Sequence, residues 1–220
     1  MKAMKRKQVL TLILIALVAG GAGIGYYYGY QAVHYIETED ARIAGDIYRV
    51  MPRVTGKINS LSVAVGDTVI ADQIVGKQDA ANLGGNMLDQ ATLRAPINGT
   101  VIQTTAKVGE VVATGQSVAL IVDKKALYVS ANIEETAIHK AKKGQLVEFT
   151  VDTYPGTMLT GKVFEIGDAT ASTFALLPTT STSGNFTKVT QRIGIKISID
   201  DQLGLNLSPG MNTIVKIHIK

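Results

Sequence analysis

Two hydrophobic patterns divide the chain. Residues 9–30 carry no charged side chain. A helix over them would measure about 33 Å at ~1.5 Å of rise per residue, close to the thickness of a membrane's hydrocarbon core. From Thr38 onward, β-branched and polar residues alternate with the period of two that is typical of strands with one buried face. The sequence therefore predicts a single N-terminal transmembrane helix followed by a mainly β chain.

The β-rich part contains an internal repeat. Residues 53–75 recur as residues 96–118, an offset of 43 positions. One three-stranded copy would leave its apolar face in water, so we predict that the two copies pack together as a small flattened barrel or sandwich. Two unrelated hairpins of similar composition are the alternative, although internal repeats usually mark stacked units. The matching pairs include Gly56 with Gly99, Ile58 with Val101, Asp67 with Glu110, Val69 with Val112, Gln73 with Gln116 and Val75 with Val118.

Both copies follow the form G-x-[IV]…V-G-[DE]-x-V-x-x-x-Q. This form resembles the split lipoyl domain of membrane fusion proteins, the periplasmic adaptor subunits of the HlyD and EmrA type. Residues 38–56, 93–101 and 174–192 carry the same resemblance. The resemblance implies a mainly β fold, with a lipoyl-like barrel-sandwich hybrid domain and a small antiparallel β-barrel that has one capping helix. Residues 134–142, acidic first and basic last, predict that helix, and Lys143–Gly144 is expected to end it.

The segment joining the two copies, residues 80–91, separates this chain from two related groups. Lipoyl and biotinyl carriers hold a modified lysine at this turn, and the segment contains no lysine. Many adaptors carry a long coiled-coil hairpin here, whose two helices would each need about 12 residues to be stable alone. We therefore expect a short form of the family that lacks the hairpin and does not reach an outer-membrane channel.

These patterns predict the domain limits. They are a basic cytoplasmic tail at 1–8, the transmembrane helix at 9–30, a connector and barrel strand at 31–47, the lipoyl-like domain at 48–123 with its linker at 80–91, and the β-barrel domain at 124–220 with a loop at 169–187.

The charge distribution predicts the topology. The formal net charge is +4, and four basic residues precede the apolar run, so the rest of the chain is neutral. The positive-inside rule then places the N-terminus in the cytoplasm and the chain after residue 30 outside the plasma or inner membrane. A cleaved signal peptide is the alternative, but the apolar run exceeds the usual length of about 7–15 residues. A neutral exterior also argues against nucleic-acid binding.

Candidate catalytic chemistry is sparse. The chain has no cysteine and three histidines, and no nucleophile or phosphate-binding motif occurs. Glu37, Glu39 and Asp40 lack the mixed ligand sets of metal sites, so we expect a solvated strand entry. The sequence predicts neither an enzyme nor a cofactor or metal site.

The resemblance implies instead an adaptor of an efflux system that pairs with an EmrB-like major-facilitator transporter. Partner contact is expected at the stretch that resembles the F-x-L-L-P…G-N-[WF]-x-K-V-x-Q-R element of EmrA-type proteins. An ABC exporter partner, an anchored β-domain that binds envelope polymer or another surface protein, and self-association stay open as alternatives. The candidate contact residues are Phe174, Leu176, Leu177, Pro178, Asn185, Phe186, Lys188, Gln191 and Arg192.

Overall fold

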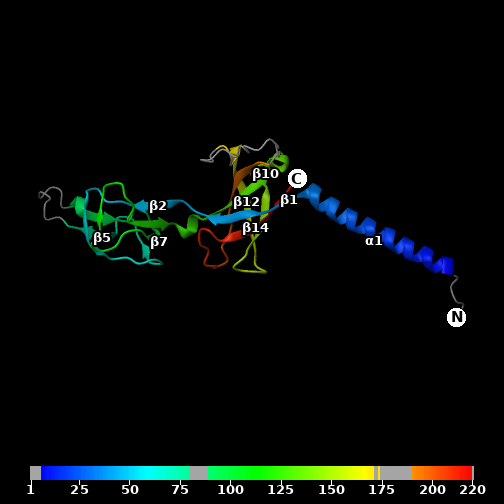
Figure 1. Ribbon diagram of the computed structural model, residues 1–220, viewed down its shortest axis with the longest axis horizontal. Helices are drawn as coiled ribbons and strands as arrows, with labels where there is room; N and C mark the ends of the chain where they lie inside the picture. The colour runs from blue at the N-terminus through cyan, green and yellow to red at the C-terminus, as the bar shows by residue number, and fades with distance from the viewer. Residues whose placement is uncertain (1–5, 80–88, 171–172, 174–189, 220) are drawn as a thin grey trace, which may run out of the picture. The chain divides into compact units, whose positions relative to one another are not determined.

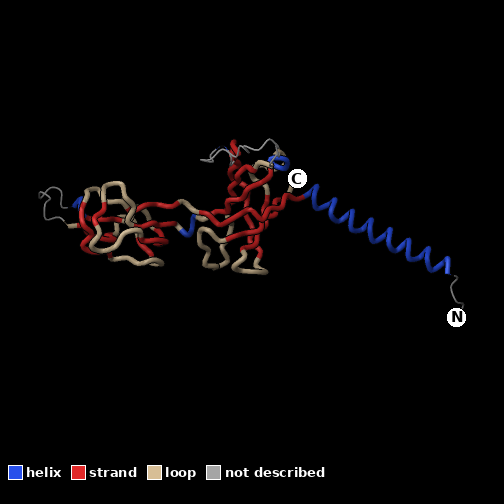
Figure 2. Tube along the Cα trace, viewed as in Figure 1, coloured by secondary structure: helices blue, strands red, loops and turns tan. Residues whose placement is uncertain are grey.

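The computed structural model describes residues 6–79, 89–170, 173 and 190–219, with the side chains of residues 6–13, 28 and 32 left out. The chain forms two compact units. The first, here the barrel unit, comprises Met1–Ala41, Ser130–Asp201 and Asn212–Lys220. The second, here the repeat unit, comprises Arg42–Val129 and Gln202–Met211. Strands dominate both units (Figures 1 and 2), as the alternating pattern predicted.

The barrel unit contains a closed six-stranded barrel with the strand order β1-β10-β13-β12-β11-β14. Alternation along β11 shows how this core forms: Val147, Phe149 and Val151 are buried, whereas Glu148 and Thr150 between them are half-buried on the outer face. Each strand thus supplies one apolar face to the core. The strands span Tyr35–Ala44 (β1), Tyr128–Glu134 (β10), Leu146–Val151 (β11), Met158–Thr170 (β12), Arg192–Ser198 (β13) and Asn212–His218 (β14).

The repeat unit is built from two four-stranded sheets, which confirms the predicted barrel-sandwich fold. Their strand orders are β2-β9-β7-β4 and β6-β5-β3-β8. The core between them holds apolar residues from both copies of the repeat, including Ile58, Val75, Val101 and Val118. The strands span Ile47–Val50 (β2), Gly56–Leu61 (β3), Thr68–Val69 (β4), Ile74–Gln78 (β5), Thr92–Arg94 (β6), Gly99–Thr104 (β7), Val111–Val112 (β8) and Ala119–Val122 (β9).

The two copies exchange their turns, in the sense that the Gly-Asp or Gly-Glu turn of each copy hydrogen-bonds to a strand of the other. The Gly66 N–H of the first copy donates to the Val101 carbonyl of the second, and the Gly109 N–H donates to the Ile58 carbonyl of the first, both at 2.8 Å. Each donor and acceptor has its equivalent at the offset of 43. Both glycines have positive φ, 98° and 93°, which a side chain would disfavour. The repeat is therefore an approximate twofold in which each copy completes the other's sheet.

The described residues of the barrel unit include two α-helices. α1 spans Arg6–His34, so it continues past Tyr30, where the predicted transmembrane helix ends. Within the part of the chain that is described, no helix is both long and apolar enough to cross a membrane. α2 spans only Glu135–Ile138, and the prediction that this helix reaches residue 142 is wrong. A short 3-10 turn, η2 (Lys124–Ala126), belongs to the repeat unit.

Candidate partner-binding site

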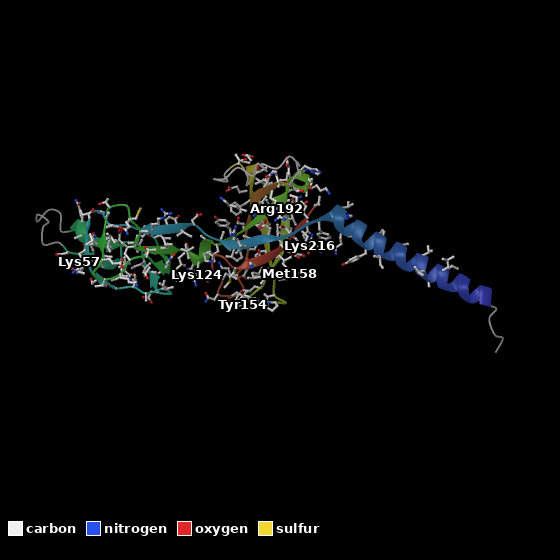
Figure 3. The ribbon with its side chains drawn as sticks, viewed as in Figure 1. Lys57, Lys124, Tyr154, Met158, Arg192 and Lys216 are labelled. Carbon is white, nitrogen blue, oxygen red and sulfur yellow. The ribbon has the colours of Figure 1, made fainter. Side chains whose placement is uncertain are left out.

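A cleft of about 590 Å³ opens on the barrel unit where β1, β10, α2 and β13 meet. It lies at the start of β13, the strand to which the predicted contact stretch returns. Figure 3 labels Arg192, the side chain that β13 contributes to the cleft. The lining residues are Ile36, Glu37, Thr38, Glu39, Asp40, Asn132, Ile133, Glu134, Ala137 and Arg192.

An ion pair spans the cleft between strands that are not neighbours. Arg192 on β13 pairs through Nη1 with Oδ2 of Asp40 on β1, although β10 lies between these strands in the barrel. The two side chains are 47% and 41% exposed, so water screens their attraction and the pair adds little to stability. What the pair fixes is the direction of the guanidinium, which points toward β1.

Backbone and hydroxyl contacts hold both sides of the cleft. Thr38 Oγ1 accepts from the Asp40 N–H at 3.2 Å and donates to the Asn132 carbonyl at 2.9 Å, which ties β1 to β10. The Glu135 N–H at the start of α2 donates to the Gln191 carbonyl at 2.9 Å. Gln191 and Arg192 are thereby held against α2 and β1 respectively.

The charge of the cleft is mainly negative. Its lining includes four carboxylates, those of Glu37, Glu39, Asp40 and Glu134, and one guanidinium, that of Arg192. Among the described residues, no group of three or more histidine, cysteine, aspartate or glutamate side chains could hold a metal ion. The arrangement can therefore receive a basic or hydrogen-bonding surface of a partner.

Of the predicted contact residues, Arg192 lines the cleft, and Gln191 lies next to it, with its carbonyl bound to α2. The other predicted contact residues fall outside the described part of the chain: Phe174, Leu176, Leu177, Pro178, Asn185, Phe186 and Lys188. The carboxylates of β1 were expected only as a solvated strand entry, and sequence reasoning missed their place beside Arg192. The available signal was that Asp40 and Arg192 both sit in stretches that resemble the same family.

Comparison with known proteins decides the family. Residues 46–124 match the family model described as the RND membrane fusion protein barrel-sandwich hybrid domain. The chain is 38% identical over 187 residues to YhbJ of Bacillus subtilis strain 168, which is named as a candidate efflux system component. That alignment covers 85% of this chain and 81% of YhbJ. The chain belongs to the EmrA-type family of membrane fusion proteins. As a membrane fusion protein, it is an adaptor of an efflux system.

Other relatives of this membrane fusion protein are longer. It is 34% identical over 143 residues to the colistin resistance protein EmrA of Acinetobacter baumannii, an alignment that covers 64% of this chain and 40% of that one. Solved structures share its fold. The periplasmic adaptor protein EmrA superposes with a TM-score of 0.58 at 15% identity, covering 84% of this chain and 99% of that one. The membrane fusion protein Spr0693 of Streptococcus pneumoniae R6 gives a TM-score of 0.61 at 17% identity, with the same coverage of both chains.

Proposed function

We propose that this adaptor is anchored in the plasma or inner membrane by residues 9–30 and pairs there with a major-facilitator transporter of the EmrB type. The N-terminus would be cytoplasmic and the chain after residue 30 extracytoplasmic, with no catalytic activity and no cofactor. The domain limits predicted from the sequence belong to the same proposal. Its support is the match to EmrA-named relatives together with the element ending in Gln191–Arg192.

The helical anchor is supported by composition and by exposure. Residues 9–30 carry no charge, and α1 runs without a break through all of them. The apolar side chains of Leu14, Leu17 and Ile24 are 62%, 70% and 61% exposed, so the protein itself does not bury them. A helix whose apolar side chains meet no protein is stable where lipid surrounds it.

The ion pair between Asp40 and Arg192 is the observation that carries the proposed contact site. It joins two stretches that both resemble the family, and it adds little stability because water screens it. A polar pair that contributes little to folding is free to serve recognition, where a fixed guanidinium beside carboxylates gives orientation. We place the transporter contact at the cleft and at the stretch from Phe174 to Arg192.

A pull-down from membranes dissolved in mild detergent tests the proposal. The tagged full chain is compared with a variant in which Phe174, Leu176, Leu177 and Phe186 are serine, and with Arg192→Gln. Lys196→Gln is the matched control, because Lys196, on the same strand as Arg192, makes an ion pair of similar exposure at 3.0 Å with Glu165 on β12. We expect the intact chain and the Lys196 variant to recover a multi-span transporter, and the other two to lose most of it.

The identity of the recovered protein separates the alternatives. A major-facilitator transporter supports the proposal, whereas an ABC exporter keeps the adaptor role and changes the partner. Recovery of an envelope protein and no transporter would replace the adaptor role with that of an anchored binder. Equal recovery by all four chains would move the contact away from this cleft.

A further inference from the structure

The helix and the barrel are joined without a linker. α1 ends at His34 and β1 begins at the next residue, Tyr35. The Ile219 N–H, just past the end of β14, donates to the His34 carbonyl at 2.7 Å. One end of the barrel is therefore fastened to the last turn of α1 through two strands, β1 and β14.

Aromatic and basic side chains gather at this junction. The His34 ring stacks on Tyr30 with 3.9 Å between centroids, and the Tyr35 ring meets the edge of His218 at 4.9 Å. The Lys216 ammonium lies 4.4 Å from the centre of the Tyr35 ring. Figure 3 labels Lys216. We call these five residues the junction cluster. Side chains with an apolar body and a polar tip are those that prefer the boundary between hydrocarbon and water.

Carboxylates lie beside the basic side chains of the junction cluster. His218 Nε2 lies 3.2 Å from Glu148 Oε1 on β11, an ion-pair distance without hydrogen-bond alignment. Glu37 on β1 and Glu148 line a shallow hollow together with Lys216. Lys216 and His218 thus face two carboxylates, so the surface is mixed rather than basic. Such a surface matches a headgroup that carries a phosphate and an ammonium better than a purely anionic one.

The length of the chain places this surface relative to a bilayer. If residues 9–30 span the hydrocarbon core, the remaining turn of α1, residues 31–34, rises about 6 Å at ~1.5 Å per residue. The headgroup layer on each side of a bilayer is roughly 5–7 Å thick. Tyr35 and the end of β14 then lie within or at the outer limit of that layer.

We propose that the junction cluster binds the headgroups of zwitterionic phospholipids, with the Lys216 ammonium on the phosphate, so that this end of the barrel rests on the membrane surface. This inference rests on the proposed membrane anchor. It also explains why no linker separates α1 from β1: a direct connection holds the barrel at a fixed height beside a membrane-embedded partner.

The absence of tryptophan makes a direct test available, because a single introduced tryptophan reports its own depth. The full chain is reconstituted in phosphatidylcholine vesicles that contain either a headgroup nitroxide or a nitroxide deep in the acyl chain. Tyr35→Trp reports the junction cluster and Leu17→Trp reports the anchor. Tyr154→Trp is the control at the far end of the barrel. The Tyr154 N–H donates to the carbonyl of Val151, and Val151 pairs with Thr213, which lies at the opposite end of β14 from His218. Glu37→Trp is a second junction reporter in case Tyr35→Trp fails to fold.

We expect the headgroup quencher to remove more than half of the fluorescence of Tyr35→Trp or Glu37→Trp and little of that of Tyr154→Trp. Adding Lys216→Gln should at least halve the quenching at Tyr35→Trp, whereas Lys216→Arg should retain it. Unquenched junction reporters with Leu17→Trp quenched by the deep nitroxide would overturn this inference and leave the anchor standing. An unquenched Leu17→Trp would overturn the anchor and the inference together. Quenching that requires anionic lipid would contradict the zwitterionic assignment.

Discussion

Two backbone positions show how the repeat copies differ at single residues. Asp72 has a positive φ of 63°, and its equivalent at the offset of 43, Gly115, has a φ of 85°. The first copy therefore holds an aspartate in a conformation that the second copy leaves to glycine. Aspartate tolerates this region better than most residues, and β-branched residues tolerate it worst.

Substitution at this pair should follow backbone strain rather than lost contacts. The contacts in which Asp72 takes part use its backbone: its N–H donates to the Ala95 carbonyl, and its carbonyl accepts from Arg94 Nη1. We expect Asp72→Gly to stay within about 1 kcal/mol of the natural chain, and Asp72→Val to lower the free energy of unfolding by about 1–2 kcal/mol. Urea denaturation measures both. A valine variant as stable as the glycine variant would show that the turn relaxes.

The residues of the cleft were predictable only as members of a motif. The resemblance pointed to Asp40 and Arg192 separately, but their meeting depends on barrel order and register, which place β1 and β13 on either side of β10. Strand alternation specifies which face a residue takes and not which strand lies beside it. The pairing of these two residues therefore needed the structure.

At the scale of elements, the close approach of β12 and β13 depends on glycine. A Cβ on Gly161 would meet the Ser198 carbonyl oxygen at 1.8 Å, whereas a Cβ on Gly194 would meet only Asn132 Oδ1 at 3.7 Å. We expect Gly161→Ala to destabilise the protein by at least about 1–3 kcal/mol through a forced backbone shift, and Gly194→Ala to have little effect. Thermal and urea unfolding of the two variants provide the measurement, with Gly194→Ala as the control. An equal loss of stability in the two variants would mean that the strand propensity of the residue, and not the close contact with Ser198, determines the destabilisation.

The capping helix shows where an element boundary escaped sequence reasoning. Charge order predicted a helix to residue 142, but α2 ends at Ile138. Beyond it, the Lys140 and Ala141 N–H groups donate to Ala137 and Ile138, three residues back rather than four. The Gln145 side chain then accepts from the Lys142 N–H at 2.7 Å and donates to the Lys140 carbonyl at 3.0 Å. The side chain of Gln145, the residue before β11, thus satisfies backbone N–H and carbonyl groups that a longer helix would have paired within itself. The order of charges along the sequence cannot reveal this.

At the scale of the molecule, the repeat made the barrel-sandwich fold predictable, since two equivalent apolar faces must bury each other. What it did not show is the exchange. β3 of the first copy pairs with β8 of the second, and β4 of the first pairs with β7 of the second. Packing of two intact copies and exchange of their turns satisfy the same hydrophobic pattern, so the pattern cannot choose between them.

The exchange predicts that neither copy of the repeat is stable without the other. Ile58 is fully buried, and its carbonyl accepts from Gly109, so Ile58→Ala removes packing in one copy beneath a turn of the other. We expect it to lower the free energy of unfolding by about 2–5 kcal/mol.

Hydrogen exchange should then accelerate at the Gly66 and Gly109 amides by similar factors, because both amides open only when the interlocked copies separate. Val65→Ala, at a side chain that is 61% exposed, should leave both amides protected. Faster hydrogen exchange at the Gly109 amide with the Gly66 amide unchanged would show that the copies open one at a time. The twofold relation would then be a feature of the geometry only, and the two copies would not unfold cooperatively.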